Sequence, residues 1–563
     1  MGARAAMMAF VLALGQPAAH DLHSALQVPL LPRDLLERPV PLRSGIGAAH
    51  DAVSTTSPGA QSFYDQGLAY LHSYVWIEAA RSFHHALRLD PKLAMAEIGL
   101  SVAYAELNAP GAAHAALARA RSLESGASDH DRHHIEARAT QMAAGQAPRD
   151  AGGFAAYRKV LDTALMQLPS DEELWLLRGM AESSDPVDRG QGGTTSAEPF
   201  YERALSLAPD HFAARHYLAH AFENSGRIDA ALIQAAKYAG MAPAIPHARH
   251  MHGHALRRAG RTDEAVAELE AADRLELAYF EAERVPAACD WHYHHNLDLL
   301  GASYQYLGQM GKAERLLKAA FALPSALVVQ AFNKREWPMF LRARGRVDEA
   351  LAAARVLIAH PSPVIRATGH IEAGHAMLAT GQFESAANES NAALTELARA
   401  QDGAALVATS LEALQGEFFL RTGPKEKGRA MLERVAKAVR AAQGPDAWTR
   451  ALFTLEAIAR AAREADDWEF AGRIAQQMLD HDAAYAGTHY ALALVADHDG
   501  DSSTARAEYA RAGKLWSGAD VDLQELATIR AKTGNGRRRE IDNEVAAAEG
   551  PTMSPLSSSR RKG

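Results

Sequence analysis

The sequence predicts an all-α superhelical solenoid of about ten helix-turn-helix repeats, and three observations support this prediction. The 563-residue chain is rich in alanine, with 48% hydrophobic and 23% charged residues, as in folded helical proteins. Glycines recur five residues before a small residue along the chain, and pairs of histidines recur at a spacing of 34 residues. Repeats of this length stack on their neighbours, so chain length alone does not fix a number of domains.

The N-terminal residues predict an exported protein. Residues 1–19 contain one arginine, then an apolar run, then small residues, a pattern typical of a secretory signal peptide. We therefore expect a periplasmic or secreted protein, with a cytoplasmic one as the alternative. Residues 20–58 carry Pro, Gly and Ser without a helical period and are predicted to be a linker. The tail, residues 534–563, is predicted to be disordered.

Charge and cysteine content exclude several classes of partner and site. The net charge is −9 without a sustained basic stripe, so we expect no nucleic-acid partner. No other apolar run reaches about 18 residues, so we expect no membrane span. The single cysteine, Cys289, excludes a disulfide framework within one chain and a cysteine-rich zinc module.

Residues 59–533 divide into helix pairs. The first clear copy has Ala79 where its helices touch, and Ala113 takes the equivalent place 34 residues later. In later copies a glycine occupies the turn, because glycine adopts turn conformations that a Cβ hinders. These glycine and contact residues are Gly226/Ala231, Gly260/Ala265, Gly308/Ala313, Gly345/Ala350, Gly381/Ala386 and Gly500/Ala505. The longer step from Ala265 to Ala313 predicts an insertion before the helix that begins near His292.

This pattern resembles the tetratricopeptide repeat family over most of residues 59–533. The resemblance implies that the first helix of each repeat lines a concave groove, where ligands usually bind. The segments YDQGLAYLHSYVWIEAARSF, HYLAHAFE, PHARHMHGHAL and HNLDLL are similar to those of a bacterial subset of the family. That subset has no settled activity, so the resemblance implies a fold and a site but no reaction.

The stretch 212–299 holds the candidate site. His216/His220 and His250/His254 each have i,i+4 spacing, which places both rings of a pair on one helix face. The two pairs are 34 residues apart, member for member, so they occupy the same positions of consecutive repeats. In the register that the resemblance implies, these positions face the groove.

The same register adds three residues and predicts a metal site. The predicted ligands are His216, His220, His247, His250, His254, His295 and Asp298. A set of imidazoles with one carboxylate suits a transition metal such as Cu, Fe or Zn, and exceeds what one tetrahedral ion needs. The predicted ligands would suffice for two ions, or for one ion with supporting histidines.

Three kinds of function fit these residues. The first is a metal-dependent enzyme, an oxidoreductase or a hydrolase. The second is a metal-free groove that binds a small molecule, a peptide or a protein segment. The third is a metal chaperone or store. We expect the histidines outside this stretch to be solvated helix residues, in particular His84, His85, His130, His133 and His134, and we expect His211 and His252 to be peripheral or packed.

Overall fold

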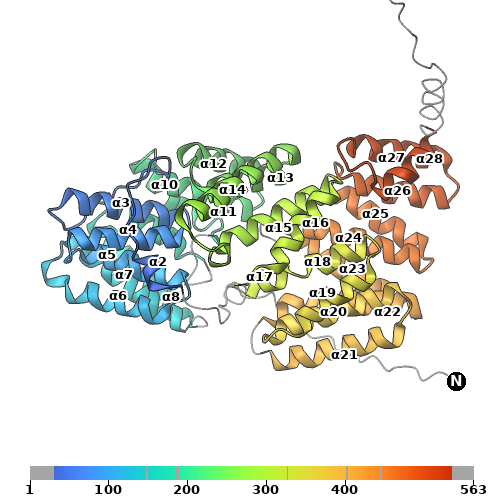
Figure 1. The fold of residues 1–563 in the computed structure, drawn as a ribbon, viewed down its shortest axis with the longest axis horizontal. Helices are drawn as coiled ribbons and strands as arrows, with labels where there is room; N and C mark the ends of the chain where they lie inside the picture. Colours follow the sequence, from blue (N-terminus) through green and yellow to red (C-terminus); the bar gives the residue numbers. More distant parts are fainter. Residues whose placement is uncertain are drawn as a thin grey trace, which may run out of the picture.

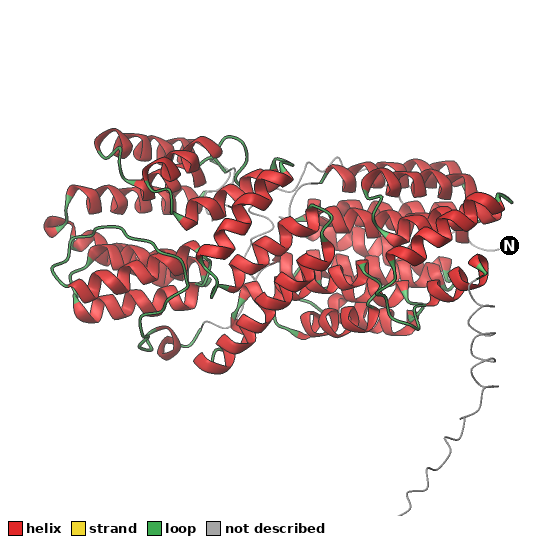
Figure 2. Cartoon of the chain, turned by 90° about the horizontal axis from the view of Figure 1, so that it is seen from above, coloured by secondary structure: helices red, strands yellow, loops and turns green. Residues whose placement is uncertain are grey.

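The computed structural model confirms the predicted all-α solenoid. Within the residues it describes, every regular element is a helix (Figure 2). These residues are 31–147, 150–183, 191–325, 328–400, 403–442 and 447–534. None of their helices is long and apolar enough to cross a membrane. The predicted signal peptide, and the predicted tail apart from Gly534, lie outside them, so export and tail disorder stay predictions.

The first half of the chain, shown in blue to green in Figure 1, is a stack of helix pairs. Each helix packs mainly on the next one along the chain, as in a solenoid. The helices are α2 (Arg33–Leu36), α3 (Pro58–His72), α4 (Trp76–Leu89), α5 (Ala94–Glu106), α6 (Pro110–Ser122), α7 (Asp129–Gln146), α8 (Ala151–Gln167), α9 (Glu172–Met180), α10 (Glu198–Leu207), α11 (Phe212–Asn224), α12 (Ile228–Met241), α13 (Pro246–Arg258) and α14 (Thr262–Glu283), with a 3₁₀ turn at Glu124–Gly126.

The second half continues the stack through α15 and α16, which lie between the two groups of helices in Figure 1. Its helices are α15 (Trp291–Tyr306), α16 (Met310–Ala322), α17 (Val328–Asn333), α18 (Glu336–Ala343), α19 (Val347–Ile358), α20 (Pro363–Ala379), α21 (Phe383–Arg399), α22 (Ala404–Thr422), α23 (Lys425–Ala441), α24 (Ala447–Glu464), α25 (Trp468–His481), α26 (Ala486–His498), α27 (Ser502–Leu515) and α28 (Gln524–Thr533). A 3₁₀ turn, Ala287–Cys289, occupies the predicted insertion between α14 and α15.

The turns and helix contacts follow the sequence pattern. Gly226 and Gly260 have φ angles of 72° and 74°, a region that residues with a Cβ rarely adopt. The alanines five positions later, Ala231 and Ala265, are buried where the two helices of their repeats meet. The small side chain allows the close approach, so the glycine–alanine register marks real repeat boundaries.

Residues 31–57, within the predicted linker, form a strap along the first repeats. The backbone N–H of Arg43 donates to Oε1 of Gln66 on α3, at 2.7 Å. The buried guanidinium of Arg81 on α4 donates to the carbonyl oxygen of Pro39 at 3.1 Å and to Glu283 at the end of α14 at 2.9 Å. The strap therefore ties α3 and α4 to α14, far along the chain.

The second half of the chain curls back on itself. The turn between α15 and α16 meets the segment before α28, where the N–H of Asp520 donates to the carbonyl oxygen of Gly308 at 3.1 Å. Arg344 bonds both carboxylate oxygens of Glu525 at 2.9 and 3.1 Å. We call these contacts the clasp, because they close the second half of the solenoid onto its own beginning.

Candidate metal centre

The predicted histidines lie on α11, α13 and α15, the first helices of three consecutive repeats. α11 carries His216 and His220, α13 carries His247, His250 and His254, and α15 carries His295. These side chains are buried, except that of His295, which is partly exposed. The structure gathers them into two neighbouring triads, each with one nitrogen per ring within 4.8 Å of the others. The triads are His216/His220/His247 and His250/His254/His295.

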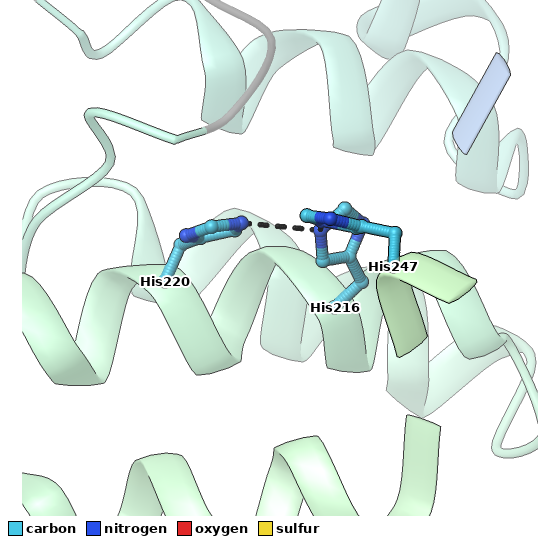
Figure 3. A group of neighbouring side chains, drawn as sticks. All are labelled: His216, His220 and His247. Carbon is cyan, nitrogen blue, oxygen red and sulfur yellow. Dashed lines mark hydrogen bonds between the residues drawn. The ribbon is translucent and has the colours of Figure 1, made fainter. Parts of the chain in front are cut away.

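The first triad has the spacing of metal ligands. Nε2 of His216 lies 3.1 Å from Nε2 of His220 and 2.9 Å from Nε2 of His247 (Figure 3). Imidazoles that bind one tetrahedral ion at about 2.0–2.1 Å would place their nitrogens about 3.3 Å apart. Small side-chain shifts would therefore convert the triad into three ligands of one ion.

A hydrogen bond determines which ring nitrogen of His216 is available to bind a metal ion. Its Nδ1 lies 2.8 Å from the backbone carbonyl oxygen of His72. Because a carbonyl oxygen only accepts, Nδ1 carries the hydrogen and Nε2 of the neutral ring carries a lone pair. That single lone pair faces the Nε2 atoms of His220 and His247. It can accept a hydrogen from only one of them, whereas a metal ion would take a lone pair from each.

The second triad is oriented in the same way. Nδ1 of His250 lies 2.9 Å from Oδ1 of Asn296, whose amide N–H donates to the carbonyl oxygen of Leu269 at 3.2 Å. Nδ1 of His254 lies 3.3 Å from Oε1 of Glu223. Both Nδ1 atoms are therefore donors, and Nε2 of the neutral His250 ring keeps its lone pair. Nε2 of His250 is buried without a hydrogen-bond partner.

The protonation of these rings suits metal binding. Burial, reinforced by neighbouring imidazoles, lowers the pKa of His216, His247 and His250 well below the ordinary value. Burial likewise lowers the pKa of His220 to about 4. These rings are neutral at pH 7, which is the form that binds a metal.

His292 belongs to the site, although the sequence analysis did not include it. Its ring centroid lies 4.8 Å from that of His247 and 4.5 Å from that of His250, so it lies between the triads. Its Nδ1 bonds the buried carboxyl of Glu276. The signal was present in the sequence, because His292 and His295 are three residues apart and share a face of α15.

Asp298 was predicted to be a ligand, and the structure corrects this. Its Oδ2 lies 3.2 Å from Nδ1 of His294, one turn earlier on α15, and it joins neither triad. The i,i+4 spacing places the carboxylate beside His294 on its own helix. His252 lies beside Glu268 and is half-buried, away from both triads.

The prediction that His130 and His134 are solvated is wrong. Nδ1 of His130 lies 2.9 Å from Asp131 and its Nε2 lies 2.8 Å from Asp51, while Nε2 of His134 lies 3.0 Å from Asp171. Burial opposes the charge on His130, but the hydrogen bonds to Asp131 and Asp51 outweigh it and raise its pKa to about 10. Both ring nitrogens then carry hydrogens, and the group forms an ion-pair network between α7, Asp51 and Asp171.

The comparisons with known proteins concern the fold alone. No family model matches the chain, and no curated protein matches it. Among solved structures, yeast Tom70 is 12% identical with a TM-score of 0.31, covering 87% of this chain and 99% of its own. The quorum sensor NprR from B. thuringiensis is 12% identical with a TM-score of 0.41, covering 70% and 98%. Human IFIT1, solved as a dimer with PPP-AAAA, is 14% identical with a TM-score of 0.38, covering 76% and 91%.

The repeat geometry decides the type of protein. Consecutive antiparallel helices pair, alanine lies at their contact, and glycine with positive φ lies in the turn. The chain is an α-solenoid of helix pairs whose repeats resemble tetratricopeptide repeats. In this solenoid α11, α13 and α15 turn histidines toward one another.

Proposed function

We propose that this tetratricopeptide-type protein binds two transition-metal ions, one in each histidine triad. The observation that carries the proposal is the orientation of His216, His250 and His254. Each donates its Nδ1 hydrogen to an oxygen, which leaves Nε2 as the ring nitrogen that faces the site. Histidines that ligate metals are oriented in this way, by hydrogen bonds from the ring nitrogen that does not bind the ion.

The ligand chemistry limits the choice of ion. The triads offer imidazole nitrogens only, which suit Cu, Zn or Fe better than Mg or Ca. Three imidazoles leave a fourth tetrahedral position open, as in catalytic sites, whereas structural sites fill all four. When bound, the ions would supply Lewis-acid or redox chemistry at that open position. The buried helices exclude water around it and hold the rings neutral. These features favour a resident, metal-dependent catalytic centre over a site that hands its ion on.

Metal analysis of protein purified without an affinity tag tests this proposal. We expect two ions per chain in the wild type. We expect one ion in the double variant His216→Ala/His220→Ala, and one in His250→Ala/His254→Ala. The matched control, His84→Ala/His85→Ala on α4, should keep two.

Thermal unfolding with and without a chelator provides a second readout. At a free-metal concentration about a thousand times Kd, binding to the folded state alone adds about 4 kcal/mol of stability. The wild type and the control should lose this increment in chelator, and a variant lacking one triad should lose less. If the wild type contains no metal and chelator changes nothing, the proposal fails. The groove would then be a metal-free binding scaffold.

A further inference from the structure

A cavity of about 310 Å³ lies within the first repeats, beside the first triad. Its wall comes from α3, α4, α5, α7 and α9 and is mainly apolar, with Leu68, Phe83, Met95, Ile98 and Met142 among the lining side chains. A volume of this order is typical of a site for a small organic molecule. The site described above does not use this cavity.

The cavity and the first triad share a wall. His72, Tyr74 and Tyr217 line the cavity. The backbone oxygen of His72 accepts the hydrogen bond from His216, and the ring of Tyr74 lies 4.7 Å from that of His216 and 4.8 Å from that of His247, between centroids. A molecule in the cavity would therefore lie against the residues that orient and cover the metal ligands.

Tyr74 is held in this wall by an uncommon backbone conformation. Its φ is 60°, in the left-handed region, where a bulky residue is rare and strained. It lies in the turn between α3 and α4, and its side chain is buried. Such conformations persist where the surrounding structure fixes them, and they cluster at functional sites.

The polar groups of the lining already bond to other protein groups. The hydroxyl of Tyr64 donates to Asp51 at 2.8 Å, and Arg138 donates to the carbonyl oxygen of Ser101 at 2.8 Å. His72 bonds the hydroxyl of Tyr217 at 2.8 Å. The lining also contains the charged side chains of Arg138, Asp51 and Glu173. A charged ligand would have to compete with the bonds that these groups already make, which is costly. The lining therefore favours a molecule that is uncharged and mainly apolar.

We propose that this cavity binds the substrate of the metal centre, and that the substrate is an uncharged, mainly apolar organic molecule. The inference rests on the proposed function, since it assigns a substrate class to that centre. His72, Tyr74 and Tyr217 then lie between the body of the substrate and the first triad.

Binding of 2-naphthol, which is uncharged at pH 7, tests the cavity directly. Val102 on α5 lines it, and Met142 lines it from α7, so Val102→Trp and Met142→Trp each place a large ring in the space. The control, Val356→Trp, adds the same ring at an exposed position of α19. In calorimetric titrations the wild type and the control should bind 2-naphthol equally, and both cavity variants at least ten-fold more weakly. Circular dichroism and metal content should be the same in all four proteins.

Loading with Cu²⁺ tests the link to the metal centre. Proton relaxation of bound 2-naphthol should be enhanced in the Cu²⁺-loaded wild type and in the control, but not in the cavity variants. A protein that holds metal but binds no 2-naphthol overturns this inference and leaves the proposed function intact. The inference is also overturned if the cavity variants bind 2-naphthol as tightly as the wild type does. It is overturned as well if Cu²⁺ does not enhance the proton relaxation of bound 2-naphthol. Binding of 2-naphthol by a wild type that takes up no metal overturns the proposed function instead.

Discussion

His130 should make the stability of the first repeats fall in alkaline solution. Its pKa is raised from the ordinary 6.5 to about 10 by hydrogen bonds to Asp131 and Asp51. The folded state therefore binds the proton more tightly than the unfolded state. The resulting stabilisation is fully present below pH 6.5 and is lost as pH rises through 10. By linkage it amounts to about 4 kcal/mol at pH 7, and more than half of it disappears between pH 7 and pH 9.

Hydrogen exchange of α7 measures this effect locally, because repeat arrays do not always unfold in one step. Exchange rates should be corrected for the pH dependence of the intrinsic rate. Protection of α7 should then fall by roughly 2 kcal/mol from pH 7 to pH 9 in the wild type and in the control variant His133→Gln. In His130→Gln it should change little, because no proton is lost there. Equal losses in all three proteins would refute the ion-pair assignment.

Two substitutions test the site and the packing. Asn296→Leu removes the oxygen that orients His250. Because the orientation of this ligand is lost, metal binding should weaken about 10–100-fold in a competition titration with a chromophoric chelator. Unchanged affinity would exclude that role for Asn296. Gly99→Ala places a Cβ about 2.3 Å from the ring of Phe83 and should destabilise the protein by about 1–3 kcal/mol in urea unfolding. Gly111→Ala, where the Cβ meets nothing within 4 Å, should not destabilise the protein, and equal effects of the two changes would contradict the packing argument.

Local patterns in the sequence predicted most of the fold. The repeat register depends on glycine turns and alanine contacts within about 40 residues of each other. The same register brought His216, His220, His250 and His254 together, because stacking neighbouring repeats superimposes equal positions. Contacts between distant segments were not predictable in this way. Two partners of His130, Asp51 and Asp171, belong to the strap and to the N-cap of α9, and no periodicity relates them to α7.

The register also failed close to the insertion before α15. It grouped Asp298 with the triad histidines, whereas the carboxylate lies beside His294 on its own helix and in neither triad. It omitted His292, which precedes the helix positions that the repeat assigns to the groove. Both errors arise because a register fixes where a Cα lies, whereas the choice of side-chain partner depends on rotamer and burial.

The contacts of the clasp can form only near the end of synthesis, so the two halves of the protein fold at different times. Asp520 and Glu525 reach Gly308 and Arg344 across about 200 residues of intervening chain, whereas α11, α13 and α15 are complete once residue 306 has been made. During translation, N-terminal repeats fold first, at roughly 5–20 residues per second. The histidine centre can therefore assemble, and take up metal, about 10–40 seconds before the second half closes. Throughout that interval the turn at Gly308 is uncovered, so the newly made protein is open at the helices next to the histidine triads.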